Sequence, residues 1–311
     1  MSDSIALRFD RLPSFLSAYR RILFGRRSGL APGARLPSIF ATCAGVAIDR
    51  GNLRAYTEAC AIGTEPGLPM HYPHVLIGPI HMNMLSHRAF PLGLMGAVHL
   101  RNHALRYRPI QLDDILDIEC TTSTERFRPQ GIELDITTRI TCRGDLLWHE
   151  IATMLIRKKS LGRKIDREDP PSPLADVFSW PDDKSVVAAR DRFAGPAGAG
   201  KRYGRISGDF NPIHMSRLLA RLFGFRRDLV HGMWGVARAT REIEALDSGE
   251  PVRADVAFKG PLYISQSVAV RTAPLQDGLS MRLFCGDEPR PAALIAIRTV
   301  SSDTTLGPVD S

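Results

Sequence analysis

The pattern of apolar and polar residues in the last third of the chain predicts one long helix followed by several short strands. The helical repeat runs from His231-Gly232-Met233 through Val236, Ala237, Thr240 and Ile243 to a stop near Ser248-Gly249. Strand-like runs follow at 256–262, 265–272, 279–285 and 292–300. A helix followed by consecutive short strands favours an α+β fold, in which an antiparallel sheet wraps around the helix.

The same succession of patterns occurs earlier in the chain. The segments 76–82, 105–110, 114–122, 132–142 and 146–156 correspond to 229–233, 256–262, 265–272 and the last two strands. The offset is roughly 150 residues, the size of one domain, and 311 residues are enough for two. We therefore expect an N-terminal domain at 1–165, a linker region at 166–195 and a C-terminal domain at 196–311. The charged, proline-rich stretch 161–173, with Asp169-Pro170-Pro171-Ser172-Pro173, is the clearest break.

A shorter segment before the second long helix carries candidate chemistry. Asn211 is a typical N-cap and Pro212 a typical first helical residue, and the apolar repeat continues to Phe223. This places Asp209 in the loop before the helix and His214 in its first turn. Such a pair can hold a water and move protons in both directions. The alternative is that these residues only form a turn and a cap.

The surrounding string is more specific than the pair alone. Residues 203–214 are Tyr-Gly-Arg-Ile-Ser-Gly-Asp-Phe-Asn-Pro-Ile-His. The chain resembles the MaoC-like or (R)-specific enoyl-CoA hydratases of the hot-dog fold, whose signature is an aromatic residue, a short spacer, a small residue, Gly-Asp-x-Asn-Pro-aliphatic-His and a second small residue six positions on. The matching residues are Tyr203, Ser207, Gly208, Asp209, Asn211, Pro212, Ile213, His214 and Ala220. Together with the repeat, the resemblance implies two tandem hot-dog domains, a double hot dog.

The resemblance also implies a reaction and its residues. The expected reaction is reversible hydration of trans-2-enoyl-CoA to (R)-3-hydroxyacyl-CoA in fatty acid metabolism, without a cofactor. Asp209 and His214 are the catalytic candidates. The substrate-binding candidates are Gly232, Met233, Asn211 and Ser207. Backbone N–H groups near Gly232, at a helix N-terminus, would bind the thioester oxygen. His231 is interpreted only as part of the helix start.

Other activities remain open on the same residues. One is a 3-hydroxyacyl dehydratase that acts on acyl carrier protein thioesters with the same Asp-His pair. Another is a non-catalytic protein that binds acyl thioesters, although binding alone does not require a proton-transfer pair. Hot-dog thioesterases are a third class, but they lack the Gly-Asp-x-Asn-Pro-x-His string.

The two halves differ at the candidate site. Aligning Arg54-Ala55-Tyr56 with Lys201-Arg202-Tyr203 places Cys60 at the position of Ser207 and Ile62 at that of Asp209. The stretch 63–72 is also too short for an Asn-Pro-Ile-His helix. We therefore expect an N-terminal half without catalytic residues, which pairs its sheet with the other half and contributes one wall of an acyl tunnel.

The net charge of +8 and the pI near 9.5 raise the question of nucleic-acid binding. The basic residues are dispersed and no nucleic-acid-binding signature accompanies them, so we expect no such partner. The densest cluster is Arg20, Arg21, Arg26 and Arg27, after the apolar stretch 15–19. It is typical of an amphipathic helix on a membrane or partner, or simply of a solvated helix face. A homodimer is a further expectation, although no motif in the sequence indicates the oligomeric state.

Cysteine and histidine usage indicates a cytoplasmic protein without a metal. The chain has 5 scattered cysteines with no Cys-x-x-Cys pair, which favours free thiols. His71 and His74 lack a nearby cysteine or carboxylate and are interpreted as loop histidines. No apolar run of about 18 residues predicts a membrane span, and the Met-Ser-Asp-Ser start lacks the features of a secretory signal.

Overall fold

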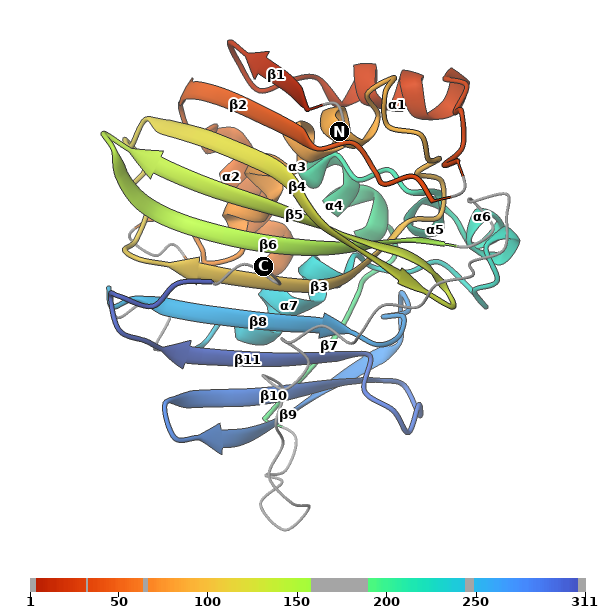
Figure 1. Ribbon diagram of the computed structural model, residues 1–311. Coiled ribbons are helices and arrows are strands. Elements are labelled where there is room, and N and C mark those ends of the chain that lie inside the picture. Colours follow the sequence, from red (N-terminus) through yellow and green to blue (C-terminus); the bar gives the residue numbers. More distant parts are fainter. Residues whose placement is uncertain (1–3, 32, 64–66, 158–189, 244–248, 307–311) are drawn as a thin grey trace.

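A computed structural model describes residues 4–31, 33–63, 67–157, 190–243 and 249–306, and in it one continuous sheet runs through the molecule (Figure 1). Over these residues the sheet has 11 strands in the order β1-β2-β4-β5-β6-β3-β8-β11-β10-β9-β7. The strands are β1 (Ile5–Phe9), β2 (Ile39–Val46), β3 (Val98–Arg106), β4 (Leu116–Arg128), β5 (Gly131–Cys142), β6 (Asp145–Arg157), β7 (Asp191–Ala194), β8 (Val252–Phe258), β9 (Ser267–Leu275), β10 (Gly278–Cys285) and β11 (Ala293–Thr299). All pairs are antiparallel except β1 with β2.

The helices pack against one face of this sheet (Figure 1). They are α1 (Phe15–Phe24), α2 (Arg50–Cys60), α3 (Tyr72–Leu85), α4 (Ala199–Ser207), α5 (Pro212–Met215), α6 (Arg217–Leu222) and α7 (Gly232–Thr240). The central helices α3 and α7 are largely buried, with Ile77, Ile80 and Met84 of α3 and Val236 of α7 fully enclosed in the main hydrophobic core. Their burial explains why both are apolar on more than one face.

The two halves repeat one topology. The order in the sheet is β2-β4-β5-β6-β3 in the first half and β7-β9-β10-β11-β8 in the second. When the five strands of each half are counted along the chain, both halves have the order first, third, fourth, fifth, second. The second strands meet in the middle, where β3 pairs with β8 from Arg101↔Ala257 to Arg106↔Val252. The predicted α+β double hot dog is therefore confirmed, with β1 and α1 added at the N-terminus.

Several predicted boundaries differ from the structure. Residues 76–82 lie inside α3, which begins at Tyr72 because Pro73 occupies its first turn, where a proline is favourable. The single helix predicted up to Phe223 is broken at Ser216, whose backbone is extended and whose hydroxyl accepts the Leu219 N–H to cap α6. Strand β8 begins before residue 256, at Val252.

The predicted linker region lies mostly outside the described residues. Asp169-Pro170-Pro171-Ser172-Pro173 lies there. The helix predicted to run through Ile243 to a stop near Ser248-Gly249 ends earlier, at Thr240, and residues 244–248 lie outside the described residues. The last part of 166–195 is ordered as β7, which pairs with β9 at the edge of the second half. The glycine-rich segment 195–200 leads directly into α4.

The basic N-terminal segment forms α1, which packs on α3. Arg21 donates to Asn83 and Ser86, and Arg27 donates to the backbone carbonyls of Ser86, His87 and Phe90. These two arginines are therefore tied to the end of α3 and do not belong to a purely solvated face. Leu16 and Phe24 are exposed on the same helix. Across the described residues, no helix is both long and apolar enough to span a bilayer.

Candidate active site

Asp209 lies in a tight loop at the end of α4. Gly208 ends this helix with φ +71°, and the Phe15 ring lies 2.0 Å from the point a Cβ would occupy, so a side chain at 208 would be both strained and obstructed. The Ser207 hydroxyl donates to the Tyr203 carbonyl at 2.9 Å and accepts the Asp209 N–H at 3.3 Å. Ser207 therefore supports the loop.

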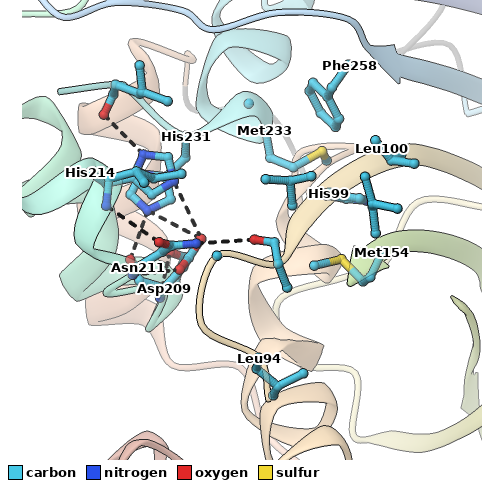
Figure 2. A pocket seen from close by; sticks show the side chains of 18 of the residues that line it. Leu94, His99, Leu100, Met154, Asp209, Asn211, His214, His231, Met233 and Phe258 are labelled. Carbon is cyan, nitrogen blue, oxygen red and sulfur yellow. Dashed lines mark hydrogen bonds and ion pairs between the residues drawn. The ribbon is translucent and has the colours of Figure 1, made fainter. Parts of the chain in front are cut away.

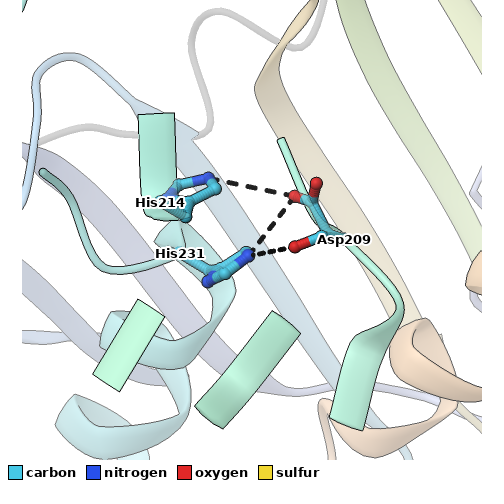
Figure 3. Close-up of side chains that lie close together, drawn as sticks. All are labelled: Asp209, His214 and His231. Carbon is cyan, nitrogen blue, oxygen red and sulfur yellow. Dashed lines mark hydrogen bonds and ion pairs between the residues drawn. The ribbon is translucent and has the colours of Figure 1, made fainter. Parts of the chain in front are cut away.

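His214 lies on α5, in the position predicted from the Asn-Pro turn. The Asn211 side chain caps this helix by accepting the Ile213 N–H, and the Asn211 N–H donates to Asp209 Oδ1 at 3.0 Å. His214 Nδ1 lies 3.1 Å from the Leu229 carbonyl, which can only accept, so Nδ1 carries the proton. The unprotonated Nε2 then faces Asp209 Oδ2 at 3.9 Å (Figure 3).

His231 joins this pair, which the sequence interpretation missed. Its ring stacks on His214 with centroids 3.7 Å apart, and its Nε2–H donates to the Asp209 carbonyl at 2.9 Å (Figure 3). The same Nε2 lies 3.6 Å from Asp209 Oδ2. His231 is the N-cap of α7, as expected, but its side chain makes no cap hydrogen bond. The histidine therefore holds the Asp209 loop against the start of α7.

Burial and mutual proximity set the charges of the three residues. Burial lowers the pKa of His214, and burial together with His214 lowers that of His231 to about 3. Burial alone would raise the pKa of Asp209, but the two imidazoles and the Asn211 N–H outweigh it and keep the pKa below its usual value. At neutral pH the site therefore contains one carboxylate and two neutral imidazoles.

This arrangement is suited to binding one water. Asp209 Oδ2 and His214 Nε2 are both acceptors, and 3.9 Å is too long for a direct hydrogen bond but short enough for one water to donate to both. A metal ion is a second possible occupant, since Asp209, His214 and His231 each offer an atom within 4.8 Å of the others. His231 Nε2–H already donates to a carbonyl, so this nitrogen would have to lose that bond to bind a metal.

The three residues border a cavity of about 550 Å³ built by both halves (Figure 2). All four predicted binding residues, Ser207, Asn211, Gly232 and Met233, line it. A Cβ on Gly232 would lie 2.5 Å from the Phe258 ring, so a side chain at this position would have to displace that ring. The roles assigned to these four residues remain predictions.

The first half supplies the opposite wall. Its contribution comes from α1, from one face of α3, from residues 94–100 and from β5 and β6, and the wall is largely apolar. Tyr19 of α1 accepts the Phe210 N–H at 2.6 Å, so the N-terminal helix also fixes the catalytic loop. No pattern in the first 50 residues indicated this contact.

His74 also lines the cavity, which corrects its interpretation as a loop histidine. It lies in the first turn of α3, with Nδ1 2.9 Å from Glu150 Oε1 on β6. His71 is the N-cap of the same helix. The carboxylate partner was missed because it is 76 residues away in the sequence.

The corresponding helices of the two halves pack against each other. Tyr56 of α2 and Tyr203 of α4 have ring centroids 6.1 Å apart, and the Asn52 amide donates to the Ile206 carbonyl at 3.0 Å. After α2, the first half connects to α3 through residues 61–71, whereas the second half has 208–231, with α5 and α6, between α4 and α7. The extra segment carries Asp209 and His214.

Comparison with known proteins agrees with this organisation. Residues 197–278 match the MaoC like domain. The chain is 28% identical over 271 residues to 3-hydroxyacyl-thioester dehydratase X of Mycobacterium tuberculosis, covering 87% of this chain and 93% of that protein. The crystal structure of HtdX from the same organism superposes with a TM-score of 0.70 at 25% identity, covering 84% of this chain and all of the other (100%).

A more distant structure shares the fold alone. The MaoC-like dehydratase of Phytophthora capsici is 14% identical, with a TM-score of 0.61, and the match covers 87% of this chain and 98% of that one. The domain match includes the Asp209 loop and α7, and the structural matches extend over both halves. Residues 197–278 are thus similar in sequence to the MaoC like domain, and both halves together have the double hot-dog fold of the dehydratase from Mycobacterium tuberculosis.

Proposed function

We propose that the protein is a hydratase and dehydratase of acyl thioesters, which adds water to trans-2-enoyl-CoA to give (R)-3-hydroxyacyl-CoA and catalyses the reverse reaction. The observation that carries the proposal is the pair of facing acceptors, Asp209 Oδ2 and His214 Nε2, 3.9 Å apart at the wall of a cavity large enough for an acyl chain. The dehydratase name of the Mycobacterium tuberculosis relative supports the same class of reaction.

In the proposed mechanism one water donates hydrogen bonds to both residues. Asp209 takes a proton as the water oxygen attacks the β-carbon, and the π electrons move onto the thioester oxygen. The new β-hydroxyl group, still between the two residues, accepts this proton from Asp209 while it gives its own to His214 Nε2. The His214 imidazolium then donates a proton at the α-carbon, and both residues return to their starting charge. The sum is addition of one water to the double bond, with both new bonds on the face that meets the pair.

The start of α7 is proposed to stabilise the negative charge that develops on the thioester oxygen. The first N–H groups of a helix have no partner within the helix, and they point toward the side from which the helix begins. Gly232 and Met233 are the first two residues of α7 and line the cavity. Donors held in place before the reaction cost no reorganisation when the charge forms.

Hydration is measured by the loss of the enone absorbance with crotonyl-, decenoyl- and bulkier enoyl-CoA. We expect Asp209→Asn and His214→Ala each to lower turnover by about 100-fold or more. Glu58→Gln is the matched control for the amide substitution, because Glu58 is an exposed carboxylate outside the cavity. Unchanged hydration by Asp209→Asn would refute the assignment.

Two further measurements separate the alternatives. Free thiol released without hydration would identify a thioesterase. The rate of hydration is compared between crotonyl-CoA and the same acyl group on acyl carrier protein. Because Asp209 and His214 act on the acyl part that both substrates share, a difference in rate identifies the preferred carrier. Binding of enoyl-CoA without turnover would favour a non-catalytic thioester-binding protein.

A further inference from the structure

The first half places a second carboxylate-imidazole pair in the same cavity. His74 Nδ1 lies 2.9 and 3.1 Å from the two oxygens of Glu150, which is completely buried on β6. The Asn102 side-chain nitrogen lies 3.4 Å from the same His74 Nδ1. The His74 side chain is 21% exposed and lines the cavity, so this pair faces the substrate space rather than the outer surface.

The Glu150 carboxylate favours the protonated form of His74. Burial alone would lower the pKa of His74, but the charge and hydrogen bond of Glu150 outweigh it and raise the pKa. The pKa of Glu150 falls correspondingly, because His74 outweighs the effect of burial. The other two histidines on this wall are neutral, since burial lowers the pKa of His81 to about 4 and that of His99 to about 3.

Nδ1–H of the imidazolium is used by Glu150, which leaves Nε2–H. Among the described residues no hydrogen-bond partner of His74 Nε2 is found. By contrast, His81 Nε2 is bound to Thr138 Oγ1 at 2.8 Å. The His74 ring stacks on His99 at 5.0 Å, and Figure 2 shows His99, Leu100 and Met154 across the cavity from Asp209. A charged donor is thus set in a wall that is otherwise mostly apolar.

A pure hydrocarbon chain on this wall would displace water from the His74 Nε2–H and would offer no hydrogen-bond acceptor to replace it. Leaving a buried charged donor without a partner is unfavourable, and an apolar residue would serve a hydrocarbon better. The thioester oxygen has its own proposed donors at the start of α7, which belongs to the other half. We propose that His74, oriented by Glu150, binds a hydrogen-bond-accepting oxygen on the acyl chain beyond the β-carbon, so that the preferred substrates are oxygenated enoyl thioesters.

This inference rests on the proposed function, and the test distinguishes the two. The kcat/KM for hydration is measured with trans-2-decenoyl-CoA and with analogues of the same length that carry one hydroxyl at C5, C7 or C9. The wild-type protein is expected to prefer at least one hydroxylated analogue by about tenfold or more, the worth of a charge-assisted hydrogen bond. Preference for decenoyl-CoA over every analogue would overturn the inference and leave the proposed function intact.

Variants assign the preference to His74. His74→Met, of similar size and without a donor, is expected to abolish the preference, so that kcat/KM falls by about tenfold more on the preferred hydroxylated analogue than on decenoyl-CoA. His74→Gln keeps a donor without the charge and should retain part of it. His81→Met, on the same face of α3, is the matched control and should keep the preference. If His74→Met lowers kcat/KM equally on decenoyl-CoA and on the hydroxylated analogues, the inference is overturned, because His74 would then act on the thioester or on the fold.

Two further outcomes are decisive. If wild-type protein hydrates none of the substrates, the proposed function fails and the inference fails with it. If His74→Met does not fold, as judged by thermal melting, the wild-type preference and the His74→Gln result still decide the inference.

Discussion

The two halves share a topology, but they differ in the segment that follows α2 in the first half and α4 in the second. These are the two helices that pack against each other where the halves meet. In the second half α4 leads into a loop and two further helices that hold Asp209 and His214, whereas in the first half α2 leads through residues 61–71 to α3. The positions equivalent to Ser207 and Asp209 are Cys60 and Ile62. The proposed catalytic residues therefore lie on one inserted segment and not on the part of the scaffold that the two halves share.

The halves also differ in the charge of the imidazoles they place in the cavity. Burial lowers the pKa of His214 and His231 in the second half and favours their neutral forms, whereas the buried Glu150 carboxylate raises the pKa of His74 in the first half and favours its protonated form. The same residue type is thus an acceptor on one wall and a charged donor on the other. Four predictions test this division of roles.

The largest effect is expected when the carboxylate is moved to the first half. Asp209→Asn should lose about 100-fold or more in turnover, and adding Ile62→Asp should restore none of it, because residues 61–71 provide no equivalent of His214. Hydration of crotonyl-CoA and thermal melting are measured for both variants. Recovery of a tenth of the wild-type rate by the double variant would show that the inserted segment is not required.

A smaller loss is expected from His231, which contacts Asp209 through the backbone. His231→Phe keeps a ring on His214 but removes the N–H bonded to the Asp209 carbonyl, so kcat should fall about tenfold with little change in KM. His231→Gln keeps a donor and should recover part of the loss. A change in KM alone would indicate that His231 contacts the substrate and does not position the loop.

The pH dependence should follow the neutral form of His214. Its pKa is lowered from 6.5 and Asp209 is ionised, so the active form persists at neutral pH. As the pH falls through the lowered pKa of His214, protonation removes the acceptor, so kcat/KM should decline with a midpoint below 6.5. A pH profile of kcat/KM from about pH 4.5 to 8 measures this, and a midpoint above 6.5 would contradict it.

The smallest effect is expected at a contact between the halves on the surface. Arg202 and Glu58 form an ion pair at 3.2 Å, with both side chains more than half exposed. Glu58→Gln should change the free energy of unfolding by less than about 0.5 kcal/mol, because solvent screens such pairs. Chemical denaturation measures this. A larger change would mean that exposed charges, and not the β3–β8 pairing and core, hold the halves together.

The predictable features were local in sequence. Asn211-Pro212 determines the start of α5, and Asp209 and His214 are close enough in the chain for the turn to bring them together. Strands β4, β5, β6, β9, β10 and β11 were predicted because their residues alternate or form apolar runs. The runs 105–110 and 256–262 overlap only the ends of β3 and β8, and no pattern predicted β1, β2 or β7. The double repeat followed from the order of these patterns.

The missed features depend on contacts between distant residues. His231 reaches Asp209 because the Leu229 N–H donates to the Ile213 carbonyl and brings the two segments side by side. Glu150 meets His74 only because β6 and α3 pack in the same half. The contact of Tyr19 with Phe210 spans 191 residues. No short spacing in the sequence contains this information.

The pairing of β3 with β8 has a consequence for how this protein can vary. When two identical subunits meet in such a sheet, each substitution appears in both, and a change in the tunnel wall also changes the copy that carries the reacting groups. Here the two sides are encoded separately within one chain. Mutational libraries confined to residues 72–100 can therefore reshape the substrate space while Asp209 and His214 keep their sequence surroundings unaltered.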